Sequence, residues 1–81
     1  MKNEEIALSQ LKIGDACVVT NVLGEGKVRR RLFDMGVTPG ARIKIIKKAP
    51  LGDPIQIIIR NYDLTLRKNE AELVIVKKEA L

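Results

Sequence analysis

The chain has 81 residues, which suffices for one small domain with a thin core, because a chain of this length buries only about 60% of its unfolded surface. Its single cysteine, Cys17, excludes an internal disulfide and favours a reducing compartment. The start is too polar for a signal peptide, and no apolar run approaches the roughly 20 residues of a transmembrane helix. The sequence therefore predicts one domain over residues 1–81 and a cytoplasmic protein.

The formal net charge is +5, and it is unevenly distributed. Between Lys27 and Lys48 the chain carries eight basic residues against one acid, Asp34. Such a one-sided basic field attracts an acidic partner, which can be nucleic acid, anionic lipid or an acidic protein face.

Near the start of the chain, Ser9 and Gln10 predict a short helical turn, with Ser9 in position to cap it. The apolar residues Ile6, Leu8, Leu11 and Ile13 surround this turn. Residues 16–23 are rich in β-branched side chains and predict a strand, with Val18, Thr20 and Val22 on one face.

A helix follows the loop at residues 24–26. Val28, Leu32 and Met35 recur at the spacing of one helical face and predict its buried stripe. Gly36 is predicted to end the helix in a left-handed conformation, with Val37 closing back onto Leu32.

Pro39 and Gly40 suit the two central positions of a type II turn, since proline presets the first and glycine tolerates the second. Residues 41–48 then alternate as a half-buried strand, in which the adjacent Ile45 and Ile46 predict a bulge. Residues 49–54 form a loop by composition, with two prolines and one glycine.

A second isoleucine strand covers residues 55–59, with Ile58 on its outer face, and the tight turn at Arg60 and Asn61 leads into a third. In that third strand Tyr62 alternates with leucines, so we expect its ring in the core. Residues 67–71 allow one helical turn, residues 73–76 form the last strand, and residues 77–81 are expected to fray.

These elements predict a mainly β fold with short helices. Five short strands with a helix inserted between the first and the second are best satisfied by a small, partly open SH3-like barrel, because closure removes strand edges that would otherwise aggregate.

Known catalytic and metal motifs fit the sequence poorly. The segment Gly24–Lys27 suggests a phosphate loop, but Asn21 and Val28 occupy the positions where that motif needs glycine and Ser or Thr. The chain has no histidine and one cysteine, so transition-metal ligands are scarce. We therefore expect no metal site, no cofactor and no enzymatic activity.

Three consecutive arginines dominate the helix. Arg30 and Asp34 are spaced to pair on its solvent face, whereas Arg29 and Phe33 share another face. Aromatic residues and arginine are enriched where protein interfaces are strongest, so Arg29 and Phe33 are candidate partner-binding residues. Two alternatives stay open: Phe33 packs under the loop at residues 50–54, or the basic field binds nucleic acid.

The proline-containing loop also has two interpretations. It is either a rigid connector, or a stiff tip that presents Leu51 and Asp53 to a partner at low entropic cost.

Together these stretches resemble the FeoA family, small accessory proteins of bacterial ferrous iron transport. The likeness includes residues 8–11 with Gly14, residues 30–32 with 35–37 and 39–40, residues 49–55, Leu66-Arg67 and Ala71. It implies an SH3-like barrel and a partner, the membrane GTPase FeoB, and no catalytic residue. The same domain type occurs at the end of some metal-dependent repressors.

The sequence hypothesis is thus a non-enzymatic protein that docks on the cytoplasmic part of FeoB at the inner face of the membrane. The alternative is an SH3-like module that binds nucleic acid or serves a transcription regulator. The predicted docking residues are Arg29, Arg30, Phe33, Pro50, Leu51 and Asp53. The predicted structural turns use Gly36, Pro39, Gly40, Gly52 and Pro54.

Overall fold

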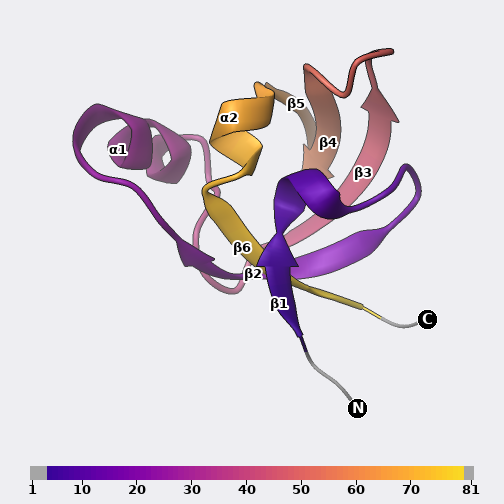
Figure 1. The fold of residues 1–81 in the computed structure, drawn as a ribbon. Coiled ribbons are helices and arrows are strands. Elements are labelled where there is room, and N and C mark those ends of the chain that lie inside the picture. Colours follow the sequence, from indigo (N-terminus) through magenta and orange to yellow (C-terminus); the bar gives the residue numbers. More distant parts are fainter. Residues whose placement is uncertain (1–3, 80–81) are drawn as a thin grey trace.

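The computed structural model describes residues 4–79 as one strongly curved antiparallel sheet with helices at its ends (Figure 1). The strand order is β1-β6-β2-β3-β4-β5, and the two end strands are not paired with each other, so the barrel is partly open. The strands are β1 (Glu5–Ala7), β2 (Ala16–Val22), β3 (Arg42–Lys48), β4 (Ile55–Ile59), β5 (Tyr62–Leu66) and β6 (Val74–Lys78). The helices are the 3-10 turn η1 (Leu8–Gln10), α1 (Gly26–Asp34) and α2 (Lys68–Ala71). The mainly β prediction is confirmed.

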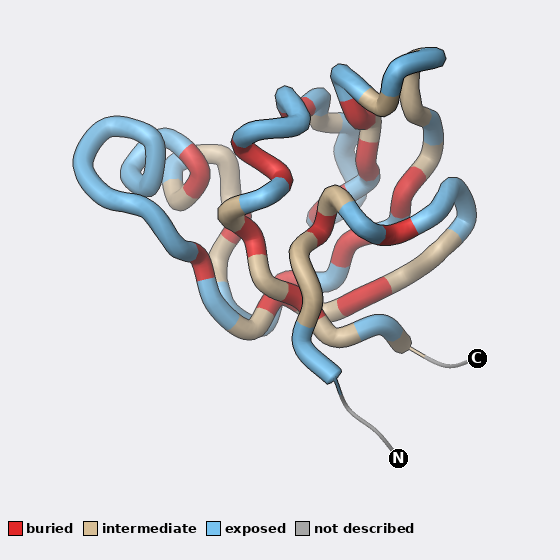
Figure 2. Tube along the Cα trace, viewed as in Figure 1, coloured by how far each residue is buried: buried red, intermediate tan, exposed pale blue. Residues whose placement is uncertain are grey.

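The core lies inside the curve of the sheet, where Figure 2 shows the buried segments. Ile55, Ile57 and Ile59 on β4 are fully buried and face the inward isoleucines of β3. Ile58 between them is 38% exposed, which confirms its predicted outward orientation. Period-two alternation of apolar residues therefore decides which face of these strands is packed.

Two irregularities reset that alternation. The register of β3 against β4 shifts between Ile45 and Lys47, which confirms the predicted bulge. A second shift, between Val19 and Asn21 on β2, was not predicted. Because the bulge inserts one extra residue, Val22 is buried on the same side as Val19, and the predicted grouping of Val22 with Val18 is wrong.

The first and last strands of the chain, β1 and β6, differ from expectation. The predicted helical turn at Ser9 and Gln10 is confirmed as η1, but Ser9 lies inside it and makes no capping bond. Residues 5–7 form a sixth strand, β1, which was not predicted. Lys77 and Lys78 belong to β6, so the prediction of fraying is wrong there, whereas residues 80–81 lie outside the described part of the chain. Lys77 and Lys78 are ordered despite their polar side chains, because their backbone pairs with β1 and β2.

The predicted turns have the expected geometry. Gly36 has φ +92°, its amide bonds to the Phe33 carbonyl, and the Val37 amide bonds to the Leu32 carbonyl, which together end α1 as a Schellman motif. Gly40 has φ +94°, and the Ala41 amide donates to the Thr38 carbonyl across the turn. Both features are those of a type II turn with Pro39 and Gly40 at its centre.

Two apolar side chains expected in the core are exposed instead. Val28 is 42% exposed, because the first turn of α1 extends past the end of the barrel. Tyr62 is 43% exposed, and its hydroxyl donates to the Met35 carbonyl at the end of α1. A phenol hydroxyl needs a hydrogen-bond partner, and this carbonyl at the rim provides one.

Candidate functional site

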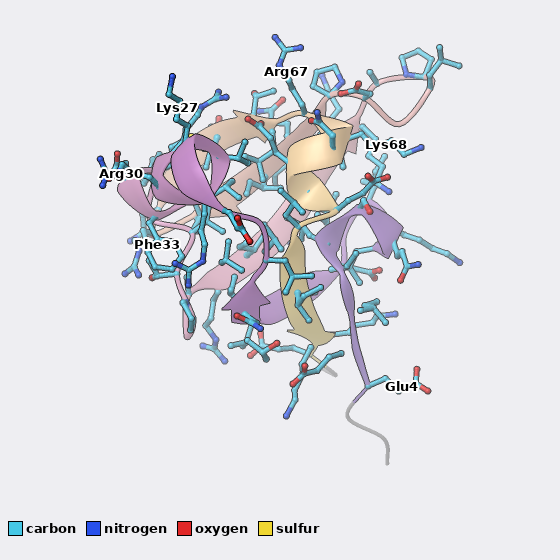
Figure 3. The ribbon with its side chains drawn as sticks, turned by 60° about the vertical axis from the view of Figure 1, so that its left-hand side comes forward. Glu4, Lys27, Arg30, Phe33, Arg67 and Lys68 are labelled. Carbon is cyan, nitrogen blue, oxygen red and sulfur yellow. The ribbon has the colours of Figure 1, made fainter. Side chains whose placement is uncertain are left out.

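The three consecutive arginines of α1 leave the helix in three directions, because successive residues are about 100° apart around the helix axis. Arg29 turns back to the barrel, and Arg31 reaches toward α2. Arg30 lies at the outer edge of α1, as Figure 3 shows. One sequence run therefore serves three different local roles.

Arg29 is held in place by two contacts. Its Nε donates to the Val22 carbonyl at 3.2 Å, and its guanidinium carbon lies 4.6 Å from the centre of the Phe33 ring. Phe33 is half-buried and packs against the core. A cation–π contact at an exposed site contributes about 0.5–1 kcal/mol. Together with the bond to Val22 and the packing of Phe33, this contact holds the Arg29 and Phe33 side chains in one arrangement at the surface.

Arg30 contributes to a shallow hollow of about 450 Å³, which Arg29 and Phe33 also line. The hollow is lined by Gly26, Arg29, Arg30, Phe33 and Asp34. The predicted pairing of Arg30 with Asp34 is wrong, since neither residue belongs to an ion pair found among residues 4–79. The guanidinium of Arg30 is therefore exposed beside an aromatic ring.

Arg31 has a structural partner that the sequence did not reveal. Its Nη1 lies 2.5 Å from Oε2 of Glu70, a carboxylate whose side chain is only 8% exposed. The other oxygen of Glu70 accepts the Arg67 amide at 2.9 Å, at the start of α2. The acid three residues after Arg67 marks a helix start in the sequence, but nothing local identifies Arg31 as the partner 39 residues away.

The proline-containing loop divides into a structural part and an exposed tip. The Gly52 amide bonds to the Ala49 carbonyl at 2.7 Å, with Gly52 at φ +80°, which closes the tip. Asp53 Oδ1 accepts the Lys68 amide at 3.0 Å, so this carboxylate caps α2. Leu51 is 89% exposed.

The structure brings together only half of the predicted docking residues. Arg29, Arg30 and Phe33 share one hollow, whereas Pro50 and Leu51 lie in the loop on the other side of α2 (Figures 1 and 3). Phe33 accordingly does not lie under that loop. The two regions approach each other through a second hollow, lined by Arg31, Asp53, Pro54, Thr65, Arg67 and Glu70.

Cys17 is fully buried in β2. Burial, and to a smaller extent the negative charges of Glu79 and Asp15, raise the pKa of its thiol to about 12. Metals bind the thiolate, so this residue is a packed hydrophobe at neutral pH. Across residues 4–79 no three His, Cys, Asp or Glu side chains gather into a metal-binding group.

The fold and this surface define a class: a small β-barrel domain that presents one basic helix carrying an aromatic ring. None of the helices in the described part of the chain is both long and apolar enough to cross a membrane. The model of the FeoA domain family matches residues 6–78, and the chain belongs to that family.

Relatives agree with this assignment. The chain is 37% identical over 70 residues to a fusion protein of Fe(2+) transport protein A and Fe(2+) transporter FeoB from Porphyromonas gingivalis. The match covers 86% of this chain and 8% of the length of that relative.

Solved structures of the family share the fold. A FeoA-like protein from Clostridium acetobutylicum superposes with a TM-score of 0.85 at 42% identity, covering 100% of this chain and 91% of the other. Stenotrophomonas maltophilia FeoA, solved with zinc and called a prokaryotic SH3 domain protein, gives 0.79 at 27% identity, covering 91% and 95%. The SH3-like barrel is thereby confirmed.

Proposed function

We propose that this domain is a non-enzymatic accessory protein of bacterial ferrous iron uptake that docks on the cytoplasmic part of FeoB. The observation that carries the proposal is the fusion relative, in which a region similar to 86% of this chain is joined to FeoB. Joining two domains in one chain keeps them at high effective concentration, which benefits partners that act together.

The α1 surface is the proposed contact. Arg29 and Phe33 are held in position by the Val22 carbonyl and by packing on the core, so binding would cost little side-chain entropy. Arg30 adds an exposed charge beside the ring. A surface of this size supports weak to moderate binding that declines with salt.

The loop tip is a second proposed contact, and it is separable from the first. Pro50 and Leu51 lie beyond α2, so a partner that covers both regions must extend across α2. Asp53 is engaged with the α2 backbone, and we therefore assign it a structural rather than a direct binding role.

Binding of the purified domain to FeoB, with a GTP analogue, with GDP and without nucleotide, tests the proposal. The double substitution Arg29→Ala and Phe33→Ala should weaken binding by about tenfold or more, as expected for an interface anchor. Lys47→Ala, an exposed basic residue of β3 outside the α1 hollow, is the matched control and should change affinity by less than about twofold.

The same titration separates the alternatives. Unchanged binding in the double variant, with a loss in Leu51→Ala, would transfer the contact to the loop tip. If FeoB does not bind and a labelled oligonucleotide binds tightly with a steep salt dependence, the nucleic-acid interpretation is correct and this proposal is wrong.

A further inference from the structure

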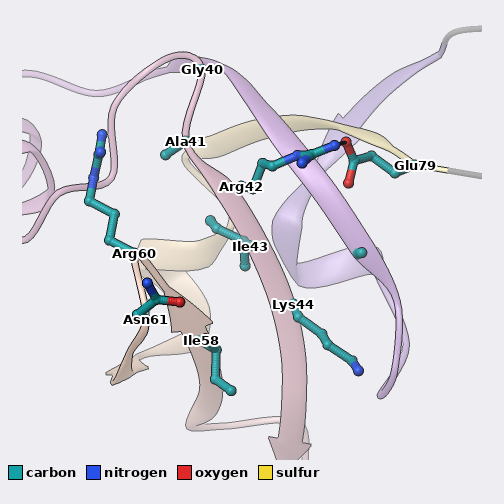
Figure 4. A pocket seen from close by; sticks show the side chains of 10 residues that line it. Gly40, Ala41, Arg42, Ile43, Lys44, Ile58, Arg60, Asn61 and Glu79 are labelled. Carbon is teal, nitrogen blue, oxygen red and sulfur yellow. Dashed lines mark hydrogen bonds and ion pairs between the residues drawn. The ribbon is translucent and has the colours of Figure 1, made fainter.

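A groove of about 540 Å³ lies on the outer face of β3 and β4 (Figure 4). It shares no lining residue with the hollow beside α1. Its lining comes from β2, β3, β4, the two adjoining turns and the residue after β6: Ala16, Gly40, Ala41, Arg42, Ile43, Lys44, Ile58, Arg60, Asn61 and Glu79.

Small residues create the groove. Ala16 pairs with Lys44 across β2 and β3, and Lys44 pairs with Ile58 across β3 and β4, so the three side chains form one row on the outer face. Ala16 fills little of the space beside that row, and Gly40 has open space where a side chain would be. The 38% exposed Ile58 supplies an apolar floor.

Three cationic side chains line the groove: Arg42, Lys44 and Arg60. Arg60 is fixed at the rim, since Nε donates to the Gly36 carbonyl at 3.3 Å and Nη2 donates to Thr38 Oγ1 at 3.0 Å. Its backbone has φ +51°, which is uncommon for a residue other than glycine, asparagine or aspartate. The turn therefore holds a guanidinium in a defined place despite a local conformational cost.

One acid already occupies part of the groove. Oε2 of Glu79 accepts hydrogen bonds from Arg42 Nε at 3.1 Å and from Arg42 Nη2 at 2.8 Å. This pair shows that Arg42 can bind a carboxylate at the edge of the groove. Lys44 takes part in none of the ion pairs found among residues 4–79.

From this geometry we propose that the groove binds an acidic segment of a partner protein in which an apolar side chain lies between acidic residues. The apolar side chain rests on Ile58, and the acids meet Lys44, Arg60 and, by displacing Glu79, Arg42. Recognition is by side chains, because β3 is paired on both edges and cannot accept an added strand. No aromatic residue lines the groove, so base stacking has no platform there.

The test is an NMR titration of the isotope-labelled domain with a blocked synthetic peptide, Ser-Asp-Glu-Leu-Glu-Asp-Ser, at low salt. We expect the largest amide shifts at Arg42, Lys44, Ile58 and Arg60. A peptide with serine in place of leucine should bind at least about threefold more weakly, because it lacks the apolar group. Shifts concentrated on α1, or equal affinity of the two peptides, would overturn the proposal.

Matched variants localise the charge effect. Lys44→Glu should weaken binding of the leucine peptide by about fivefold or more, whereas Lys47→Glu on the same strand should change it by less than about twofold. Equal losses in both variants would show attraction to net charge alone and contradict a specific groove.

The substitution Glu79→Gln should change peptide affinity in the opposite direction from Lys44→Glu. Removing the competing carboxylate from Arg42 should tighten peptide binding by about two- to threefold. Weaker binding in this variant would show that Arg42 is not a carboxylate-receiving group. A labelled oligonucleotide that binds more tightly than the peptide and shifts the same groove amides would also overturn the proposal.

Discussion

The barrel and helix α1 are held by different kinds of interaction. The inward isoleucines of β3 and β4 are at most 2% exposed, and each touches the same continuous core. In α1, by contrast, Leu32 is the one fully buried residue of nine, and Figure 2 shows most of the helix exposed. The helix is secured instead by the Schellman motif, the Arg29 bond to Val22 and the Arg31 ion pair with Glu70.

This difference separates stability from recognition. Apolar burial supplies the barrel with most of its folding free energy, since each buried aliphatic side chain contributes about 1.5–3 kcal/mol. Polar contacts at a surface contribute less, but they fix the directions of the side chains that make them. Substitutions on α1 can therefore change binding while the barrel stays folded. Four measurements would sharpen or contradict this contrast.

The largest effect should follow Ile57→Ala in β4. This side chain is fully buried, so we expect a loss of about 3–4 kcal/mol in the free energy of unfolding. The neighbouring Ile58→Ala removes the same atoms from the outer face and should cost less than about 1 kcal/mol. Urea denaturation measures both, and similar losses would show that the barrel interior is not the source of stability.

The next effect concerns the end of α1. Gly36→Ala places a side chain at φ +92°, where its Cβ would lie 3.3 Å from Arg60 Nε and 3.4 Å from the Tyr62 hydroxyl. We expect a loss of about 2 kcal/mol from backbone strain and displaced contacts.

Gly14→Ala is the matched control for that substitution. Gly14 has φ +94°, and nothing lies within 4 Å of the point that an alanine Cβ would occupy, so this variant reports the strain alone, about 1 kcal/mol. Denaturation curves that coincide for the two variants would show that the Arg60 and Tyr62 contacts do not hold the helix.

A smaller effect should follow Arg31→Met, which removes the tie between α1 and α2. The Arg31 side chain is 57% exposed, so solvent screening limits the expected loss to about 1 kcal/mol. Arg30→Met, one residue earlier and directed outward, should stay within about 0.5 kcal/mol. Thermal unfolding of both variants tests this, and a larger loss at Arg30 would contradict the assigned roles.

The smallest effect should come from Asp15 on the barrel surface. The Lys12 amide, 2.8 Å away, and then the charge of Lys78 lower the pKa of its carboxyl below 3.8. The unfolded state then binds the proton more readily, so the contribution is present above about pH 3.8 and is lost as the pH falls through the lower folded-state pKa. Asp15→Asn should be slightly less stable than the parent at pH 7, and the difference should vanish in acid titrations followed by circular dichroism.

The sequence predicts best where one residue dictates local geometry. Gly36 and Gly40 predict a helix end and a turn, because glycine adopts the positive φ that these positions require. The adjacent Ile45 and Ile46 predict a bulge, because they break the alternation of buried and exposed residues. The β1 strand was missed because three residues carry too little periodicity to separate strand from helix.

The candidate site was predicted less completely, for a different reason. Arg29 and Phe33 are four residues apart on one helix, so their contact follows from helical geometry. The Arg31 pair with Glu70 and the Asp53 bond to α2 depend on how distant elements pack, and no local pattern encodes that. For the same reason the helix and the loop were predicted to form one surface, and the structure separates them across α2.

The pairing of β1 with β6 has a consequence for tethering. Glu5 lies opposite Lys77, so both ends of the described chain leave the barrel side by side, far from α1 (Figure 1). A neighbouring domain attached at either end would leave the basic helix unobstructed. Short flexible tethers give effective concentrations in the millimolar range, on the order of a thousand times a micromolar dissociation constant. A contact too weak to persist between separate proteins would then be occupied nearly all the time.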